Sequence, residues 1–351
     1  MQTDMHYYGT FALARAAGMS APAAGIIATA AEYVDDSDYV DIQLDDEAFI
    51  HAPPTAHHPT NKENILPVDQ RRVWVPFHFI PGNQGDSTAE RMICRKDSDL
   101  AREMVEFHLS GAGESYILER MGIAAHVYAD TFSHYGFSGI SSHFNKVAAD
   151  SISLLNVRDG SFLEKIMRQA SDFEDKYIKG RIADAVGLGH GSVATYPDRP
   201  YLQWRFTYAD PAHDSGVRSN QVTFLEAAEK LHGIFSRLAA LLPNYAEPGG
   251  GRSFASIRET VSEILALEAG MDSRIYAWQM AAAKGKLFKG EEIPPYSPDV
   301  FSADVEAMSQ HTTESVQGTN AYGFLRAAQL HREFVLHTLL PKYGLTTLLQ
   351  L

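Results

Sequence analysis

The stretch MGIAAHVYADTFSHYGFSG at residues 121–139 decides the fold, because it joins a helical pattern to three side chains that can bind metal. His126, Asp130 and His134 recur at four-residue steps. Four residues turn a helix by about 400°, so these side chains share one face, with neighbouring Cα atoms about 6 Å apart along the axis. His126 and His134 are then about 12 Å apart, too far to bind one zinc ion together. A helix whose central Asp130 bridges two or more metal ions fits this spacing, and a polar stripe held by hydrogen bonds is the alternative.

Helical patterns also dominate the rest of the chain, because Ala, Leu, Met and charged residues recur at three- and four-residue steps. The predicted helices cover residues 8–18, 21–34, 97–109, 114–135, 143–155, 161–184, 220–242, 253–284 and 319–340. Small residues in the central stretch should let neighbouring helices approach it closely, namely Gly122, Ala124, Ala125 and Ala129. The segment RRVWVPFHF at 71–79 indicates an extended conformation. We therefore predict an all-α, multi-helix fold with a few short extended segments.

The length of 351 residues permits one large core or two fused ones. We predict one elaborated domain, with a core over residues 1–245 and an accessory helical layer over residues 246–351 packed on it. The three glycines at 249–251 indicate a flexible connection between the two parts. His311, His331 and His337 fall in the C-terminal layer, where we expect an exposed face or a phosphate-steering patch.

The charge and the cysteine content narrow the possible functions. A net charge of −14 argues against a general nucleic-acid or anionic-membrane surface, although local basic patches stay possible. The single cysteine, Cys94, excludes an intramolecular disulfide framework and a thiolate zinc site. A bound metal ion must therefore use His, Asp and Glu.

No part of the sequence indicates a membrane span or a signal peptide. The N-terminus MQTDMHYYGT lacks a basic region followed by an apolar stretch, and no later run approaches the roughly 18 apolar residues of a span. We expect a cytoplasmic protein, or one exported by a secretion system that needs no signal peptide.

Several motifs resemble a known fold. The segment HVYADTFSH at 126–134 resembles the central helix of the zinc-dependent phospholipase C and single-strand-specific nuclease fold. The chain also resembles an uncharacterised bacterial family of that type, with DMHYYGT, AEYVDDS, WVPFHFIPG, this helix and GHGxxxxxPDxP in the same order. The resemblance implies a phospholipase C/P1 nuclease-like helical bundle.

The resemblance also implies a set of metal ligands. The two-metal core would use five residues, His6, Asp35, His78, His126 and Asp130. A third ion would use His134 together with His190 and Asp198 from the loop GLGHGSVATYPDRP at 187–200. The phospholipase C enzymes begin with a tryptophan whose terminal amine and carbonyl bind metal, and here Asp4 is expected to substitute for it. Asp36 is an alternative to Asp35, with Asp35 favoured.

The implied activity is hydrolysis of a phosphoester by a metal-bound hydroxide. We expect two or three zinc ions, or another divalent transition metal such as iron, manganese or cobalt. Asp35 and Asp130 are the expected catalytic carboxylates, with Asp35 as general base. The favoured substrate is a phospholipid headgroup ester, and no stable nucleic-acid partner is expected. A single-strand nuclease and a non-enzymatic, metal-stabilised binding protein remain the alternatives.

Overall fold

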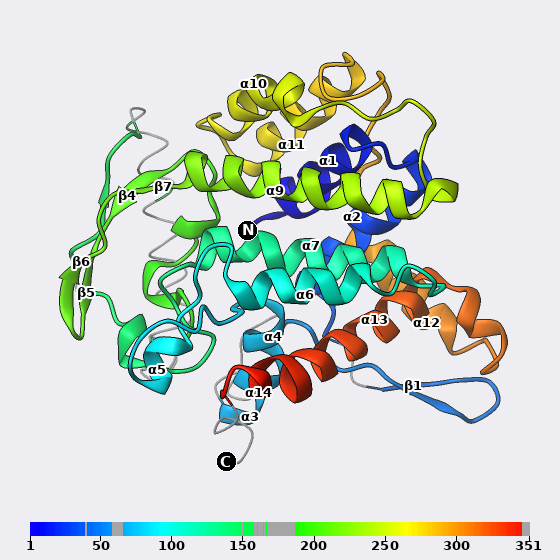
Figure 1. Cartoon of the computed structure of the whole chain (residues 1–351), viewed down its shortest axis with the longest axis horizontal. Coiled ribbons are helices and arrows are strands. Elements are labelled where there is room, and N and C mark those ends of the chain that lie inside the picture. Colours follow the sequence, from blue (N-terminus) through cyan, green and yellow to red (C-terminus); the bar gives the residue numbers. More distant parts are fainter. Residues whose placement is uncertain are drawn as a thin grey trace.

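The computed structural model describes residues 1–38, 41–57, 66–148, 150–157, 160, 164, 166 and 187–345. Of the described residues, 57% are helical and 8% lie in strands, which confirms the mainly α class (Figure 1). The predicted helix over 161–184 lies almost entirely outside the described residues.

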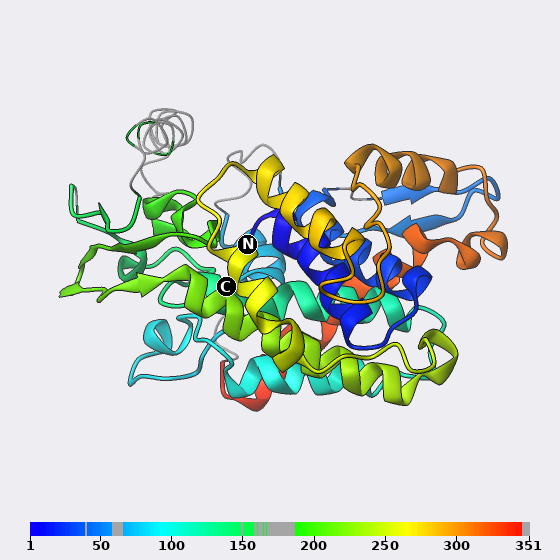
Figure 2. The same cartoon turned by 90° about the horizontal axis from the view of Figure 1, so that it is seen from above.

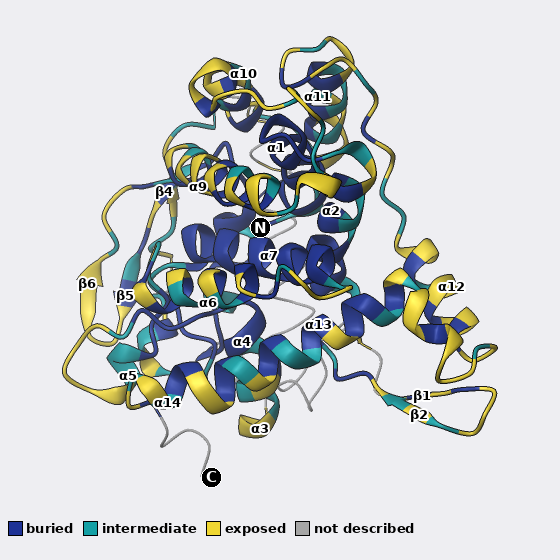
Figure 3. Cartoon of the chain, turned by 45° about the vertical axis from the view of Figure 1, so that its right-hand side comes forward, coloured by how far each residue is buried: buried dark blue, intermediate teal, exposed yellow. Residues whose placement is uncertain are grey.

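Helix α7 (Ile117–His134) lies at the centre, and every one of its residues is buried (Figure 3). It packs against α2 (Ala21–Asp36), α6 (Asp99–Leu109), α9 (Asn220–Leu241) and α13 (Asn320–Phe334). Gly122 permits the contact with α2, because a Cβ at that position would lie 2.4 Å from the carbonyl oxygen of Ile27. The expected close approach of a neighbouring helix is thereby confirmed.

The N-terminal segment forms two consecutive helical stretches before α2. The π-helical turn η1 (Asp4–Gly9) continues directly into α1 (Thr10–Ala16), so the predicted helix at 8–18 begins four residues earlier than expected. Helix α2 begins after Ser20, whose hydroxyl accepts a hydrogen bond from the Ala23 amide and caps the helix. The predicted helix at 21–34 is confirmed and extends to Asp36.

The segment at 71–79 is helical, and the prediction of an extended segment was wrong. It contains the π-helical turn η3 (Gln70–Trp74) and the short helix α4 (Val75–Phe77), preceded by α3 (Pro67–Asp69). The Gln70 side chain donates to the Ser141 hydroxyl at 2.9 Å and accepts from the Ser141 amide at 2.7 Å. These tertiary bonds fix the start of the segment, and they cannot be seen in its alternating pattern.

The predicted helix at 143–155 is also absent among the described residues. That range holds only the 3-10 turn η4 (His143–Asn145) and strand β3 (Ser153–Leu154). The Asn145 amide donates to the carbonyl oxygens of Ser138 and Ile140 at 2.9 and 3.0 Å. Asn side chains compete in this way with helical hydrogen bonds, so the chain turns instead.

The described strands are short and form three small antiparallel sheets. They are β1 (Asp41–Gln43) with β2 (Phe49–His51), β4 (Gln203–Arg205) between β3 and β7 (Arg218–Ser219), and β5 (Thr207–Ala209) with β6 (Ala212–Asp214). Trp204 and Phe206 pack with Phe137, just beyond α7, in a second hydrophobic cluster. This cluster holds the loop at 187–200 against the C-terminal end of α7.

The C-terminal helices pack on the N-terminal ones, as Figure 2 shows for the helices drawn in yellow over those in blue. The predicted helix at 253–284 is divided at 266–270 into α10 (Phe254–Leu265) and α11 (Met271–Ala283). Helix α12 (Pro298–Met308) precedes α13. The remaining short elements are α5 (Thr88–Arg91), η6 (Gly191–Val193), η7 (Tyr196–Asp198), η8 (Pro243–Tyr245), η9 (Ser315–Gly318), η10 (Val335–Leu339) and α14 (Leu340–Lys342).

Residues on both sides of the proposed boundary at 245/246 share one hydrophobic cluster. Trp278 of α11 and Phe324 of α13 belong to it, together with Phe11 of α1. Among the described residues, no helix is long and apolar enough to cross a membrane.

Candidate metal centre

The structure brings eight of the nine expected ligands together around the C-terminal half of α7. They form three groups in which one ligand atom per residue lies within 4.8 Å of the others. The groups are His6, His126 and Asp130; Asp35, His78 and His126; and His134, His190 and Asp198. His126 belongs to two groups, so the first two are adjoining parts of one centre.

The first group is fully buried and joins η1 to α7. The ring of His6 stacks on the ring of His126 with centroids 3.8 Å apart. His6 Nε2 lies 3.2 Å from Asp130 Oδ1, and His126 Nε2 lies 3.3 Å from Asp130 Oδ2. Neither ring nitrogen of His6 makes a hydrogen bond among the described residues. Burial and the neighbouring His126 lower the pKa of His6 to about 3, so this ring is neutral and offers a lone pair.

The second group joins the end of α2 to the residue after α4. His78 Nδ1 lies 3.4 Å from His126 Nε2 and 3.8 Å from Asp35 Oδ1. His126 Nε2 is also 3.8 Å from Asp35 Oδ1. Burial opposes ionisation of Asp35, but His126, His6 and His78 lower its pKa. The Asp35 side chain is 31% exposed, so this edge of the centre reaches solvent.

The third group joins the end of α7 to the loop at 187–200. His134 Nε2 lies 3.2 Å from Asp198 Oδ1, and His190 Nε2 lies 3.7 Å from Asp198 Oδ2. The Ser133 hydroxyl donates to Asp198 Oδ1 at 2.9 Å. Burial lowers the pKa of His190 to about 4, which leaves the imidazole neutral at pH 7. Together these three side chains direct two imidazole nitrogens and one carboxylate toward a shared position.

Four of the five imidazoles bond a backbone carbonyl through one ring nitrogen. His126 Nδ1 donates to the Ala31 oxygen at 2.7 Å, and His134 Nδ1 donates to the His78 oxygen at 2.9 Å. The other two bonds join His78 Nε2 to Thr55 at 3.0 Å and His190 Nδ1 to Ala194 at 2.7 Å. A nitrogen that donates to a carbonyl carries the proton, so the opposite nitrogen presents a lone pair to the centre. Metal-binding histidines in proteins are oriented in this way.

The spacing of the facing atoms fits a transition metal. Zinc bonds of about 2.0–2.1 Å at tetrahedral angles separate neighbouring ligand atoms by about 3.3 Å. The nitrogen-to-oxygen and nitrogen-to-nitrogen distances given above for the three groups run from 3.2 to 3.8 Å. Lone pairs of His126 and His78 face each other at 3.4 Å, which is unfavourable unless a cation or a proton lies between them. The donor set therefore fits zinc or a related ion.

The place between the first and third groups attracts positive charge. The amino group of Met1 lies there, 2.6 Å from Asp130 Oδ1 and 3.4 Å from Asp198 Oδ1. Although burial alone lowers the pKa of an amine, Asp130 and Asp198 raise the pKa of this one to about 11. Burial likewise opposes ionisation of Asp130, yet His134, the amine and the other histidines hold its pKa well below the usual range.

Asp4 does not join the centre, which corrects the expectation that it replaces a terminal ligand. Its carboxylate is buried and accepts hydrogen bonds from Arg274 Nε and Nη2 at 2.7 and 3.2 Å. Asp36, the alternative to Asp35, accepts a hydrogen bond from the Tyr296 hydroxyl. Asp35 is thus the carboxylate that α2 directs toward the histidines.

Sequence reasoning missed several supporting residues. The carbonyl oxygens of Ala31, Thr55 and Ala194 carry no side-chain signal, so only the fold identifies them. Glu32 is buried and accepts from the Thr3 hydroxyl at 2.6 Å, and its place one helical turn before Asp35 was a signal that could have found it.

His331 also differs from its expected exposed position. It is fully buried, donates to the Pro76 carbonyl oxygen at 2.8 Å and accepts from His108 at 2.9 Å. It therefore supports the backbone just before His78 and belongs to no phosphate-steering surface.

One comparison with known proteins identifies a family, and none adds an activity. Searches of the curated proteins and of the solved structures found no match. Residues 1–339 match the DUF6765 family, described as a family of unknown function. Because this match covers nearly the whole chain, the protein belongs to the DUF6765 family.

Proposed function

We propose that this protein is a zinc-dependent phosphoester hydrolase that cleaves a phospholipid headgroup ester as phospholipase C does. One observation carries the proposal: imidazoles held by backbone carbonyls through one ring nitrogen turn the opposite nitrogen toward shared carboxylates. The phospholipase C/P1 nuclease-like bundle is part of this proposal, supported by the motifs in common and by the central position of α7.

Bound divalent ions would lower the pKa of a water molecule and neutralise charge on the phosphoester oxygens. The chain's own residues would supply the rest. His6, His126 and Asp130 are almost completely buried, so they would hold an ion in a fixed, closed position. Asp35 is 31% exposed and its pKa is lowered, so its carboxylate can accept a proton from a nucleophilic water. His190, 19% exposed, lies at a second opening beside Asp198.

These partly exposed ligands support an enzyme over a closed structural metal site. Structural zinc sites are saturated by four protein ligands, whereas catalytic sites keep a position for water or substrate. The second and third groups each supply three protein ligands, with one member partly open to solvent. The net charge of −14 favours a lipid headgroup over a polyanionic nucleic acid as substrate.

Metal content is the first test of the proposal. Elemental analysis of gently purified protein should find two or three zinc ions per chain, matching the three ligand groups. Asp130→Asn should lose most of this metal, because Asp130 faces ligand nitrogens on both oxygens. Asp272→Asn, at an exposed position in α11, is the control and should keep it. A folded wild type that holds no zinc and takes up none would overturn the proposal.

Activity is the second test, and it separates the two substrate classes. The zinc-loaded protein should release phosphocholine from phosphatidylcholine vesicles, and Asp130→Asn should not. Cleavage of a single-stranded oligonucleotide with no lipid cleavage would instead identify the nuclease alternative. Full zinc occupancy without either activity would favour a metal-stabilised binding protein.

A further inference from the structure

A second site lies on the side of α2 that faces away from the metal centre. The Ala31 carbonyl and the Asp35 side chain face the centre, whereas Ile26 and Tyr33 lie roughly on the opposite face of the helix and Gly25 lies about a quarter turn from the centre. These three residues line a pocket of about 270 Å³ between α2, α12 and α13. The pocket is somewhat smaller than the roughly 300–1,000 Å³ of sites for drug-sized ligands, so a ligand here must be small.

The pocket contains one buried carboxylate, that of Glu119 in the first turn of α7. Glu119 is only 7% exposed. Among the described residues, no lysine, arginine or histidine pairs with it, and the adjacent Arg120 pairs with Glu114 at 2.7 Å instead. Its only hydrogen-bond donor in the described part of the chain is its own backbone amide. Because burial is the main influence on this group, the pKa of Glu119 rises to about 7.

The surrounding residues keep space beside this carboxylate. A Cβ at Gly323 of α13 would lie 2.6 Å from Glu119 Oε1, so a side chain at that position would collide with the carboxylate. A Cβ at Gly25 would meet nothing within 4 Å, so the pocket is open on that side. Ile26, Tyr33 and Phe324 add apolar and aromatic surface, and Asp304 lies at an exposed position of α12.

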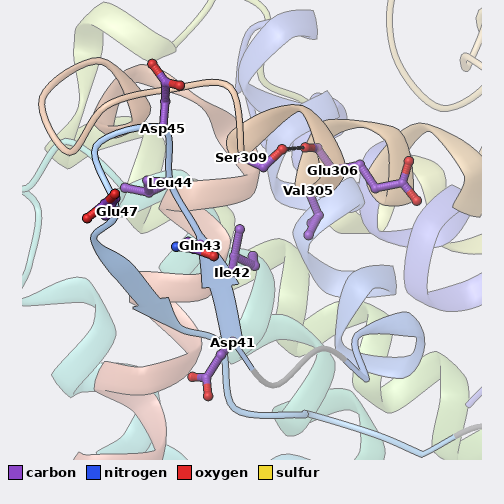
Figure 4. A pocket seen from close by; sticks show the side chains of 9 residues that line it. All are labelled: Asp41, Ile42, Gln43, Leu44, Asp45, Glu47, Val305, Glu306 and Ser309. Carbon is purple, nitrogen blue, oxygen red and sulfur yellow. Dashed lines mark hydrogen bonds between the residues drawn. The ribbon is translucent and has the colours of Figure 1, made fainter.

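A second acidic pocket provides a comparison for Glu119, because its carboxylates are exposed to water. Between β1 and α12, Asp41, Asp45, Glu47 and Glu306 line an open pocket (Figure 4). All four are exposed, so water solvates them and they need no ligand. Glu119 differs because water reaches it poorly and no described cation compensates its charge.

We propose that the pocket beside Glu119 binds a small organic ammonium ion, with the ammonium group on the Glu119 carboxylate and its apolar body against Tyr33 and Phe324. A buried charge is tolerated when it is paired, and an ammonium ligand supplies the missing partner. Tyr33 and Phe324 would contribute apolar contact to the body of the ligand. The site is separate from the metal centre and does not depend on the proposed hydrolase activity.

The test measures binding of methylammonium, cyclohexylammonium and benzylammonium to the full-length protein at pH 8 by calorimetry, with benzyl alcohol as the neutral comparison. At least one ammonium probe should bind, and Glu119→Gln should weaken its affinity by at least tenfold. Glu306→Gln, an exposed change on α12, should leave the affinity unchanged. Gly25→Phe should block binding by filling the pocket, whereas Gly25→Ala should reduce it less and keeps the helix intact.

Each other outcome overturns the assignment. If no ammonium probe binds the folded protein, the pocket is not a cation site. If benzyl alcohol binds as well as benzylammonium, or if Glu119→Gln binds the ammonium equally well, the pocket recognises apolar shape alone. Circular dichroism of each variant shows that it is folded before its affinity is compared.

Discussion

Asp130 is a fully buried carboxylate in the candidate metal centre, and it faces three histidines. Its Oδ1 faces His6 Nε2 at 3.2 Å, and its Oδ2 faces His126 Nε2 and His78 Nδ1 at 3.3 and 3.4 Å. A carboxylate this deeply buried costs several kcal/mol of desolvation unless positive charge compensates it. The nearby carboxylates of Asp130 and Asp35 raise the pKa of His78, although burial opposes this. A proton on His78 can therefore supply compensating positive charge when no metal ion is bound. Metal binding would displace that proton.

Asp35 and Asp36 form a matched pair for testing the second ligand group. Asp35→Asn should lower the turnover of a phosphodiester substrate by about 10²–10⁴-fold, because the amide cannot accept the proton of the nucleophile. Asp36→Asn should retain most activity, since an amide oxygen still accepts from the Tyr296 hydroxyl. Turnover and zinc content measured together check both variants. Equal losses in the two would show that Asp35 has no special role.

His331 should make stability depend on pH. Burial lowers its folded-state pKa to about 4, whereas the unfolded value is about 6.5. As the pH falls below 6.5 the unfolded chain takes up the proton first, so stability that is present above pH 6.5 is lost toward pH 4. Between pH 6.5 and pH 5 this one group should cost about 2 kcal/mol.

Chemical denaturation at both pH values would measure this loss. His331→Gln should show a smaller decrease than the wild type, because the amide does not titrate. His337→Gln, at a position 61% exposed, is the control and should behave like the wild type. An unchanged pH dependence in His331→Gln would contradict a neutral, buried His331.

At the scale of elements, the contact between α2 and α7 positions two candidate ligands, His126 and Asp35. Helix α2 supplies the Ala31 carbonyl that orients His126, and it ends at the turn that presents Asp35. Gly122 sets the separation of the two helices, because a Cβ there would lie 2.4 Å from the Ile27 oxygen and 2.6 Å from the Ala30 Cβ. A small change in this contact would displace both ligands.

Two glycine substitutions should therefore have opposite effects. Gly122→Ala should destabilise the protein by about 1–3 kcal/mol through overpacking, and it should weaken zinc binding. Gly233→Ala, at an exposed position in α9 where nothing lies within 4 Å, should stabilise the protein by about 0.5–1 kcal/mol. Thermal unfolding with and without zinc measures both. A stabilising Gly122→Ala would show that the helices can separate at no cost.

At the scale of the whole molecule, buried polar bonds tie the C-terminal helices to the N-terminus. Arg274 of α11 donates to Asp4 at 2.7 Å and to the Gln2 side chain at 2.6 Å. It thereby fixes the start of η1, which presents His6 to the centre. The C-terminal helices thus take part in positioning a ligand that lies more than 260 residues away in the sequence.

Breaking this buried pair should be costly. Arg274→Gln should destabilise the protein by about 3–5 kcal/mol, because it leaves the Asp4 carboxylate buried without its partner. Arg237→Gln breaks the exposed pair with Glu106 and should cost about 0–1 kcal/mol. Denaturant unfolding compares the two variants. Similar small losses in both would mean that Asp4 has access to water.

The sequence by itself determined the mainly α class and the central helix, because both depend on local periodicity. His126, Asp130 and His134 share a face for the same reason. It did not determine the conformation of 71–79 or 143–155, where hydrogen bonds from Gln70 to Ser141 and from Asn145 to Gly187 override the local pattern.

Tertiary structure alone decided which of the remaining polar residues meet. Asp4 and Asp35 are both acidic residues close to helical segments, yet Arg274 takes the first and three histidines surround the second. His331 has the sequence context of a surface residue and is buried against His108. The partner of a buried charge comes from across the fold, and no spacing along the chain specifies it.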